Sequence, residues 1–184
     1  MSDRATTPPI LVMMGASGCG KTTVGRALAT RLGWTWREGD EFHPQANLEK
    51  MQAGIPLDDA DRVPWLTAIG HWMDAQAHDG EPAVIACSAL KRSYRDSLRD
   101  GRAQVWFLYL RVSRAELERR VQTRHHPYMP ASLLDSQLAA LEEPQPDEPR
   151  SITIEAGGSV TQTVAAAMRE LGARDRVGST GENR

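Results

Sequence analysis

The sequence has little cysteine, little net charge and no long apolar run, and each scarcity argues against a class of protein. Two cysteines, Cys19 and Cys87, are too few for the disulfide framework of a small secreted domain and fit a reducing cytoplasm. A formal net charge of −2 provides no basic surface for nucleic acid or a membrane. All apolar runs fall short of the roughly 20 residues that span a bilayer. We therefore expect a cytoplasmic protein without nucleic-acid or membrane partners.

The length and the two ends of the chain indicate a single domain. A chain of 184 residues suffices for one well-filled domain and is too short for two ordinary ones. Residues 1–9 are polar and lack the apolar core of a secretion signal, which predicts a disordered N-terminal segment. Residues 173–184 contain glycine, serine and charge without apolar periodicity, which predicts a flexible tail. The domain is then expected over residues 10–172.

The strongest local signal directly follows the apolar run at residues 10–14. Residues 15–22 match the phosphate-loop pattern G-x-x-x-x-G-K-[ST], and a helix is expected to begin near Lys21. Turn amides and the positive helix end bind phosphate, Lys21 can reach the outer phosphates, and the Thr22 hydroxyl can ligate Mg²⁺. A glycine-rich turn that binds nothing is the alternative, but every motif position is filled. The sequence therefore predicts a nucleoside triphosphate site formed by Gly15, Ala16, Ser17, Gly18, Cys19, Gly20, Lys21, Thr22 and Thr23.

Strand-like runs alternate with helical periodicity along the chain. The runs lie at residues 10–14, 34–37, 83–87, 105–110 and 151–155. Three of the runs are almost wholly apolar, which is typical of parallel strands buried on both faces. A helix is predicted over about residues 62–78, with Pro64 in its first turn. This alternation predicts an α/β domain with a parallel sheet, right-handed crossovers and ligands beyond the carboxyl ends of the strands.

Two carboxylates, Glu38 and Asp40, follow the second predicted strand and are separated by one glycine. Close to a phosphate loop, one carboxylate could hold Mg²⁺ through water. The other could orient an acceptor hydroxyl and take its proton during phosphoryl transfer. An ordinary polar turn is the alternative, and the spacing alone does not decide between the two.

Candidate ligands for a second substrate lie in later polar stretches, each of which also has a structural explanation. Lys50 and Arg62 belong to a stretch that could be a charge-rich surface helix and its loop. Ser88 and Lys91 follow the third predicted strand, where Ser88 could simply cap the next helix and Arg95 could lie on its solvent face.

A lid is predicted over about residues 120–132. Arg120 and Arg124 close a predicted helix that leads into a short aromatic segment bounded by prolines. Such a segment suits a lid that closes over phosphates and excludes water. We expect the two arginines to move in with it.

Taken together, these motifs resemble the gluconokinase family of phosphate-loop kinases, relatives of shikimate kinase and adenylate kinase. The resemblance covers roughly residues 10–155. The blocks that look specific to this family are His43-Pro44…Asp61-Arg62…Trp65 and Cys87-Ser88-Ala89-Leu90-Lys91. The chain departs from the family pattern at Cys19, where serine is frequent, at Glu38, where aspartate is usual, and at His126-Pro127-Tyr128, which replaces Gly-His-Phe.

The resemblance implies a fold and an activity. The implied fold is a P-loop NTPase of the nucleoside-monophosphate-kinase type. It is a three-layer sandwich with a five-stranded parallel sheet of order 2-3-1-4-5 and a lid. The implied reaction is the ATP- and Mg²⁺-dependent phosphorylation of D-gluconate to 6-phosphogluconate, an entry to the pentose phosphate or Entner–Doudoroff route. Relatives are often dimeric, so a homodimer is possible.

The resemblance also implies roles for the candidate residues. Lys21 and the loop amides would hold the β and γ phosphates, and Arg120 and Arg124 would stabilise charge between donor and acceptor. Asp40 would align the 6-hydroxyl of the substrate. The implied Mg²⁺ ligands are Thr22 directly and Glu38 and Asp40 through water. The implied gluconate ligands are Arg62 or Lys50 for its carboxylate, and His43, Ser88 and Lys91 for hydroxyls or phosphate.

Three other functions remain as alternatives. The protein could be a kinase of the same architecture that acts on shikimate or on a nucleoside monophosphate. It could be a regulatory module that hydrolyses ATP slowly and phosphorylates nothing, although the acceptor-side groups argue against that. An adaptor with a vestigial loop is disfavoured because Lys21 and Thr22 are intact.

Overall fold

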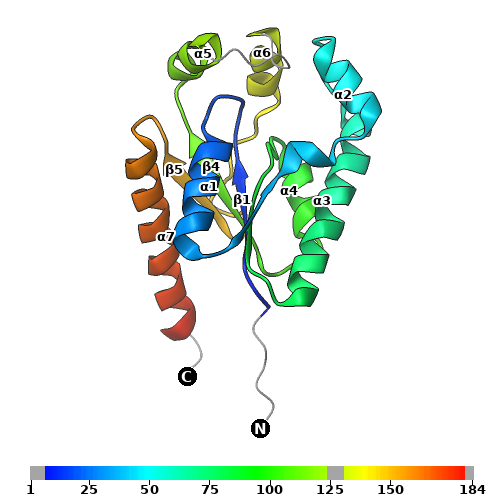
Figure 1. The fold of residues 1–184 in the computed structure, drawn as a ribbon. Coiled ribbons are helices and arrows are strands. Elements are labelled where there is room, and N and C mark those ends of the chain that lie inside the picture. The colour runs from blue at the N-terminus through cyan, green and yellow to red at the C-terminus, as the bar shows by residue number, and fades with distance from the viewer. Residues whose placement is uncertain (1–6, 124–130, 181–184) are drawn as a thin grey trace.

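The computed structural model describes residues 7–123 and 131–180, which form a parallel sheet between two helical layers (Figure 1). The sheet has five strands in the order β2-β3-β1-β4-β5, which confirms the predicted topology. Its strands are β1 (Ile10–Met14), β2 (Thr35–Glu38), β3 (Ala83–Ala86), β4 (Val105–Arg111) and β5 (Ser151–Glu155). The helices are α1 (Lys21–Leu32), the short 3-10 helix η1 (Gly39–Phe42), α2 (Gln45–Gln52), α3 (Asp59–Asp79), α4 (Arg92–Arg99), α5 (Arg114–Thr123), α6 (Ala131–Ala140) and α7 (Val160–Thr180).

The apolar pattern of each strand follows from its place in the sheet. The central strand β1 pairs in parallel with β3 and β4, and all five of its residues are buried because helices cover both faces. Helices α1 and α7 pack on one face, whereas α3 and α4 pack on the other. The edge strand β2 alternates between exposed and half-buried residues, which explains its weak sequence signal.

Helix α3 begins earlier than its sequence pattern indicated. The Asp58 carboxylate accepts a hydrogen bond from the Asp61 amide at 2.8 Å, and the Asp61 carboxylate accepts one from the Asp58 amide at 3.0 Å. This reciprocal capping box fixes the helix start at Asp59. Pro64 therefore lies in the second turn, and its prediction in the first turn was wrong. The sequence signal for the observed start of α3 was the pair Asp58 and Asp61, two aspartates three residues apart.

The carboxyl ends of β1, β2 and β3 bring three predicted site segments to the same edge of the sheet. The phosphate loop follows β1, η1 follows β2, and the loop before α4 follows β3. A hydrogen bond of 3.2 Å from the Gly15 amide to the Ser88 carbonyl joins the first and third segments. Helices α2, α5 and α6 stand beyond this edge (Figure 1).

The ends of the domain remain predictions. Most of the proposed N-terminal segment lies outside the described residues, and β1 begins at Ile10. Helix α7 continues to Thr180, past the domain end expected at residue 172. No helix in the described part of the chain is both long enough and apolar enough to cross a membrane.

Gly39 is required where η1 passes over the end of β3. A Cβ atom at this position would lie 2.0 Å from the Ala86 carbonyl oxygen, a backbone atom that cannot rotate away. We expect Gly39→Ala to lower the free energy of unfolding by at least about 1–3 kcal/mol, the usual cost of overpacking. Urea denaturation measures this loss. Gly157→Ala is the matched control, since a Cβ there meets no atom within 4 Å. Equal stability of the two variants would contradict the steric argument.

Candidate active site

A cavity of about 700 Å³ opens at the carboxyl edge of the sheet, between the phosphate loop, η1, α2 and α6. It brings together most of the residues predicted for the site. Those that line it are Ser17, Gly18, Gly20, Lys21, Thr22, Thr23, Glu38, Asp40, His43, Arg62 and Ser88. The predicted residues that do not line it are Gly15, Ala16, Cys19, Lys50, Lys91 and Arg120, and Arg124 lies outside the described residues.

The phosphate loop has the geometry of an anion site. Gly15, Gly18 and Gly20 have positive φ angles of 138°, 83° and 105°, conformations that side chains other than glycine rarely adopt. The Lys21 ammonium donates hydrogen bonds to the carbonyls of Gly15 at 2.9 Å and Ala16 at 3.2 Å. The lysine therefore lies across the mouth of the loop, where outer phosphates would meet it.

Helix α6 touches the loop directly. The Ser17 amide donates a hydrogen bond of 2.7 Å to the Gln137 side-chain oxygen. Because phosphate-loop amides are the donors to phosphate, a bound nucleotide would have to displace this oxygen to use the Ser17 amide. The sequence did not indicate that Gln137, which is 120 positions from Ser17, reaches the loop.

Thr22 and Glu38 meet at the end of β2. The Thr22 hydroxyl donates a hydrogen bond of 2.7 Å to the Glu38 carboxylate. Burial raises the pKa of Glu38 and Asp40 repels its charge, although the Thr22 hydrogen bond opposes both effects. A hydroxyl and a carboxylate in contact, beside the phosphate loop, suit Mg²⁺, which takes few protein oxygens and completes its shell with phosphate and water. Among the described residues, no group of three or more histidine, cysteine, aspartate or glutamate side chains is arranged so that it could hold a metal ion.

His43 faces the candidate catalytic carboxylate. Its Nε2 lies 3.8 Å from Asp40 Oδ1, and its ring stacks on Trp65 with centroids 4.4 Å apart. Burial lowers the pKa of His43 to about 4, although Asp40 opposes this, so the ring is neutral at pH 7. The Asn47 amide nitrogen lies 3.3 Å from Nδ1, and as a donor it makes Nδ1 the acceptor. The ring proton is then on Nε2, directed toward Asp40.

The predicted acceptor-side cations differ in whether they are already paired. The Lys50 ammonium contacts both Asp61 carboxylate oxygens, at 2.6 and 2.8 Å. Lys91 contacts both oxygens of Asp59, at 2.7 and 2.9 Å. Arg62 lines the cavity and, among the described residues, makes no hydrogen bond or ion pair. Arg62 is therefore the cation best placed for an anionic ligand.

Arg120 holds the phosphate loop from outside the cavity. It pairs with Glu116 at 2.6 Å and donates to the Ala156 carbonyl at 3.1 Å. Longer contacts reach the carbonyls of Gly18 and Cys19, at 3.4 and 3.5 Å. The structure therefore places Arg120 beside the loop that would bind the phosphates.

Part of the cavity wall is apolar, and the sequence reasoning did not identify it. Its side chains come mainly from α2 and the segment after it, and a smaller part comes from α5 and α6. They are Leu48, Met51, Ile55, Pro56, Leu57, Val121 and Leu133. The one sequence signal for this wall is the helical spacing of Leu48 and Met51. Any amphipathic helix has that spacing, so it does not by itself indicate a ligand-binding surface.

Comparisons with known proteins agree with this geometry. The AAA domain family matches residues 10–144. The gluconokinase of Gluconobacter oxydans is 55% identical over 142 residues, covering 77% of this chain and 80% of that protein. The thermosensitive gluconokinase of Escherichia coli is 42% identical over 144 residues, covering 78% and 77%. A crystal structure of a gluconokinase from Sinorhizobium meliloti superposes with a TM-score of 0.85 at 39% identity, covering 96% and 99%. The chain therefore belongs to the gluconokinase family of phosphate-loop kinases.

Proposed function

We propose that this kinase transfers the γ-phosphoryl group of ATP to the 6-hydroxyl of D-gluconate, giving 6-phospho-D-gluconate and ADP. One observation carries the proposal. A single cavity is lined by Lys21 and Thr22 of the phosphate loop and also by Asp40 and Arg62, in a chain whose relatives are named gluconokinases. A donor phosphate and an anionic polyol can therefore meet in one space.

The donor side binds the triphosphate and its metal. The amides of the loop, the N-terminus of α1 and Lys21 hold the β and γ phosphates. Thr22 and Glu38, already in contact, would hold Mg²⁺. When bound, Mg²⁺ neutralises phosphate charge as the phosphoryl group is transferred.

The acceptor side positions the sugar acid. Asp40 accepts the proton of the 6-hydroxyl while that oxygen bonds to the γ-phosphorus and the bond to the β-phosphate oxygen breaks. The neutral His43 ring, held by Asn47 and Trp65, orients Asp40. Arg62 pairs with the gluconate carboxylate.

Further expectations accompany this activity. ATP and Mg²⁺ are the proposed cofactors, the cytoplasm is the proposed compartment, and a homodimer is a possible assembly. The proposed lid is the segment over about residues 120–132, part of which lies outside the described residues. Its closure would bring Arg120 and Arg124 toward the transferred group.

A coupled assay of ADP release tests the substrate. With Mg²⁺ and ATP, we expect saturable ADP release with D-gluconate and only background with shikimate or AMP. Release with shikimate or AMP instead would identify a different kinase. ADP release that does not respond to any acceptor would support the regulatory module.

Glu38→Gln is expected to affect activity and stability in opposite directions. The amide still accepts the Thr22 hydrogen bond but loses the charge that attracts Mg²⁺, so the Mg²⁺ concentration for half-maximal activity should rise. Folding raises the pKa of Glu38, so its ionised form is less favourable in the folded than in the unfolded chain at neutral pH. The neutral variant without nucleotide should therefore melt at an equal or higher temperature. Differential scanning fluorimetry and a Mg²⁺ titration measure the two effects, and a lower melting temperature would contradict the second.

A further inference from the structure

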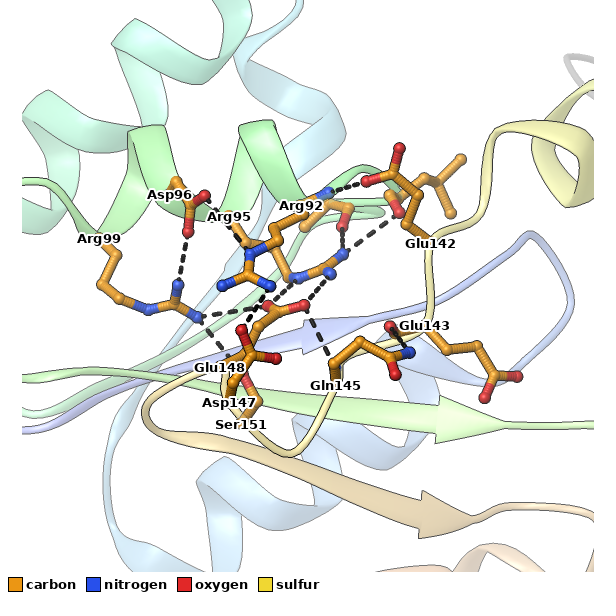
Figure 2. A network of polar contacts seen from close by, with 12 residues as sticks. Arg92, Arg95, Asp96, Arg99, Glu142, Glu143, Gln145, Asp147, Glu148 and Ser151 are labelled. Atoms are coloured by element: carbon orange, nitrogen blue, oxygen red, sulfur yellow. Dashed lines mark hydrogen bonds and ion pairs between the residues drawn. The ribbon is translucent and has the colours of Figure 1, made fainter.

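A buried arginine on α4 holds the loop that precedes this helix (Figure 2). Arg95 is 0% exposed, although its sequence position allowed a solvent-facing side chain. Its guanidinium forms two hydrogen bonds with Glu148, at 2.7 and 2.5 Å. The remaining nitrogen donates to the carbonyls of Ala89 at 3.0 Å and Leu90 at 3.2 Å. Arg95 therefore joins the loop to a distant segment of the chain.

The part of the loop that Arg95 holds has an unfavourable backbone conformation. Ala89 has a φ angle of 42°, in the left-handed region that is sterically unfavourable for a residue with a Cβ. Such a conformation persists only where surrounding contacts impose it, and it is concentrated at functional sites. Ser88, the preceding residue, lines the cavity, and its carbonyl accepts a hydrogen bond from the Gly15 amide. The angle at Ala89 thus sets the direction of the chain beside the cavity.

The segment after α6 supplies the other half of this support. The Glu142 amide donates a hydrogen bond of 2.8 Å to the Leu90 carbonyl, and the Glu142 carboxylate accepts a hydrogen bond of 2.7 Å from the Arg92 amide. Glu148, which accepts from Arg95, is itself fully buried. The loop before α4 is therefore held in place from two sides, by α4 and by residues 142–148.

We propose that Arg95 and Glu148 are positioning residues for the sugar-acid substrate. They hold Ala89 in its left-handed conformation, and this conformation makes Ser88 face the cavity. The inference rests on the proposed function. A role in stability alone explains the pair less well, because a buried ion pair is often no more stabilising than apolar residues of the same volume. A planar guanidinium, by contrast, can bind one carboxylate and two carbonyls at once.

Arg95→Lys tests the inference because lysine keeps the charge beside Glu148 and loses the planar fork. We expect the KM for gluconate to rise about tenfold or more, the effect of losing one charge-assisted hydrogen bond, with the KM for ATP within about twofold. The matched control is Arg102→Lys, whose guanidinium contacts Asp74 with two bonds of 2.7 Å and does not line the cavity. That variant should lose thermal stability with both KM values unchanged.

Ala89→Gly in the Arg95→Lys background provides the second test. Glycine adopts a positive φ without a steric penalty, so the loop should regain its conformation and the KM for gluconate should return toward the wild-type value. If Arg95→Lys does not fold, Glu148→Gln replaces it as the test, because glutamine has the same shape as glutamate. This variant should also raise the KM for gluconate and leave the KM for ATP nearly unchanged. An unchanged KM for gluconate, a parallel rise in both KM values, or no rescue by glycine would overturn the inference. Wild-type protein that releases no ADP with gluconate would instead overturn the proposed function.

Discussion

Asp40→Asn is expected to lower kcat by roughly 10²- to 10⁴-fold, the usual contribution of a positioned general base. The amide keeps the shape of the side chain but cannot take the proton of the 6-hydroxyl. ATP binding should persist, because Lys21 and Thr22 are unchanged. Steady-state kinetics with gluconate and a titration with fluorescent nucleotide measure the two quantities.

Glu41→Gln is the matched control for this experiment. Glu41 lies in the same short helix η1 and pairs with Arg37 at 3.3 Å on the surface, and it does not line the cavity. Its loss should leave kcat near the wild-type value. Unchanged turnover in Asp40→Asn would remove Asp40 from the chemistry. A similar fall in both variants would indicate that η1 as a whole, rather than the Asp40 carboxylate, had been disturbed.

Arg62→Met is expected to raise the KM for gluconate by about tenfold to several hundredfold, because it removes the cation that would bind the substrate carboxylate through charge-assisted hydrogen bonds. The KM for ATP should change little. Arg62 is preferred over Lys50 because Arg62 lines the cavity, whereas Lys50 is neutralised by Asp61 at 2.6 Å and does not line it.

Lys50→Met provides the comparison that decides between the two cations. Removing Lys50 leaves Asp61 with its capping role at the start of α3, so a modest loss of stability and a nearly unchanged KM for gluconate are expected. A larger KM effect in Lys50→Met than in Arg62→Met would assign the carboxylate to Lys50. Substrate analogues without the carboxylate provide an independent measurement, since Arg62→Met should hardly alter their KM.

The parts of the protein that the sequence predicted well are those governed by contiguous residues. The apolar run of β1, the glycines of the phosphate loop and the start of α1 at Lys21 agree with the sequence pattern. The sheet order, by contrast, came from the family resemblance, since periodicity reveals which segments are strands but not which strands pair. The edge strand β2 gave a weak signal because only one side of it is covered.

What the sequence alone determined is where phosphate can bind and which residue types stand near it, because a loop and the helix that follows it are shaped by neighbouring residues. Only the tertiary structure decided which of those residues are available. Lys91 is paired with Asp59, 32 positions away, and Arg95 is buried against Glu148, 53 positions away. The physical reason is that a charge is neutralised by whichever opposite charge the fold brings within about 4 Å, and separation along the chain does not limit that distance.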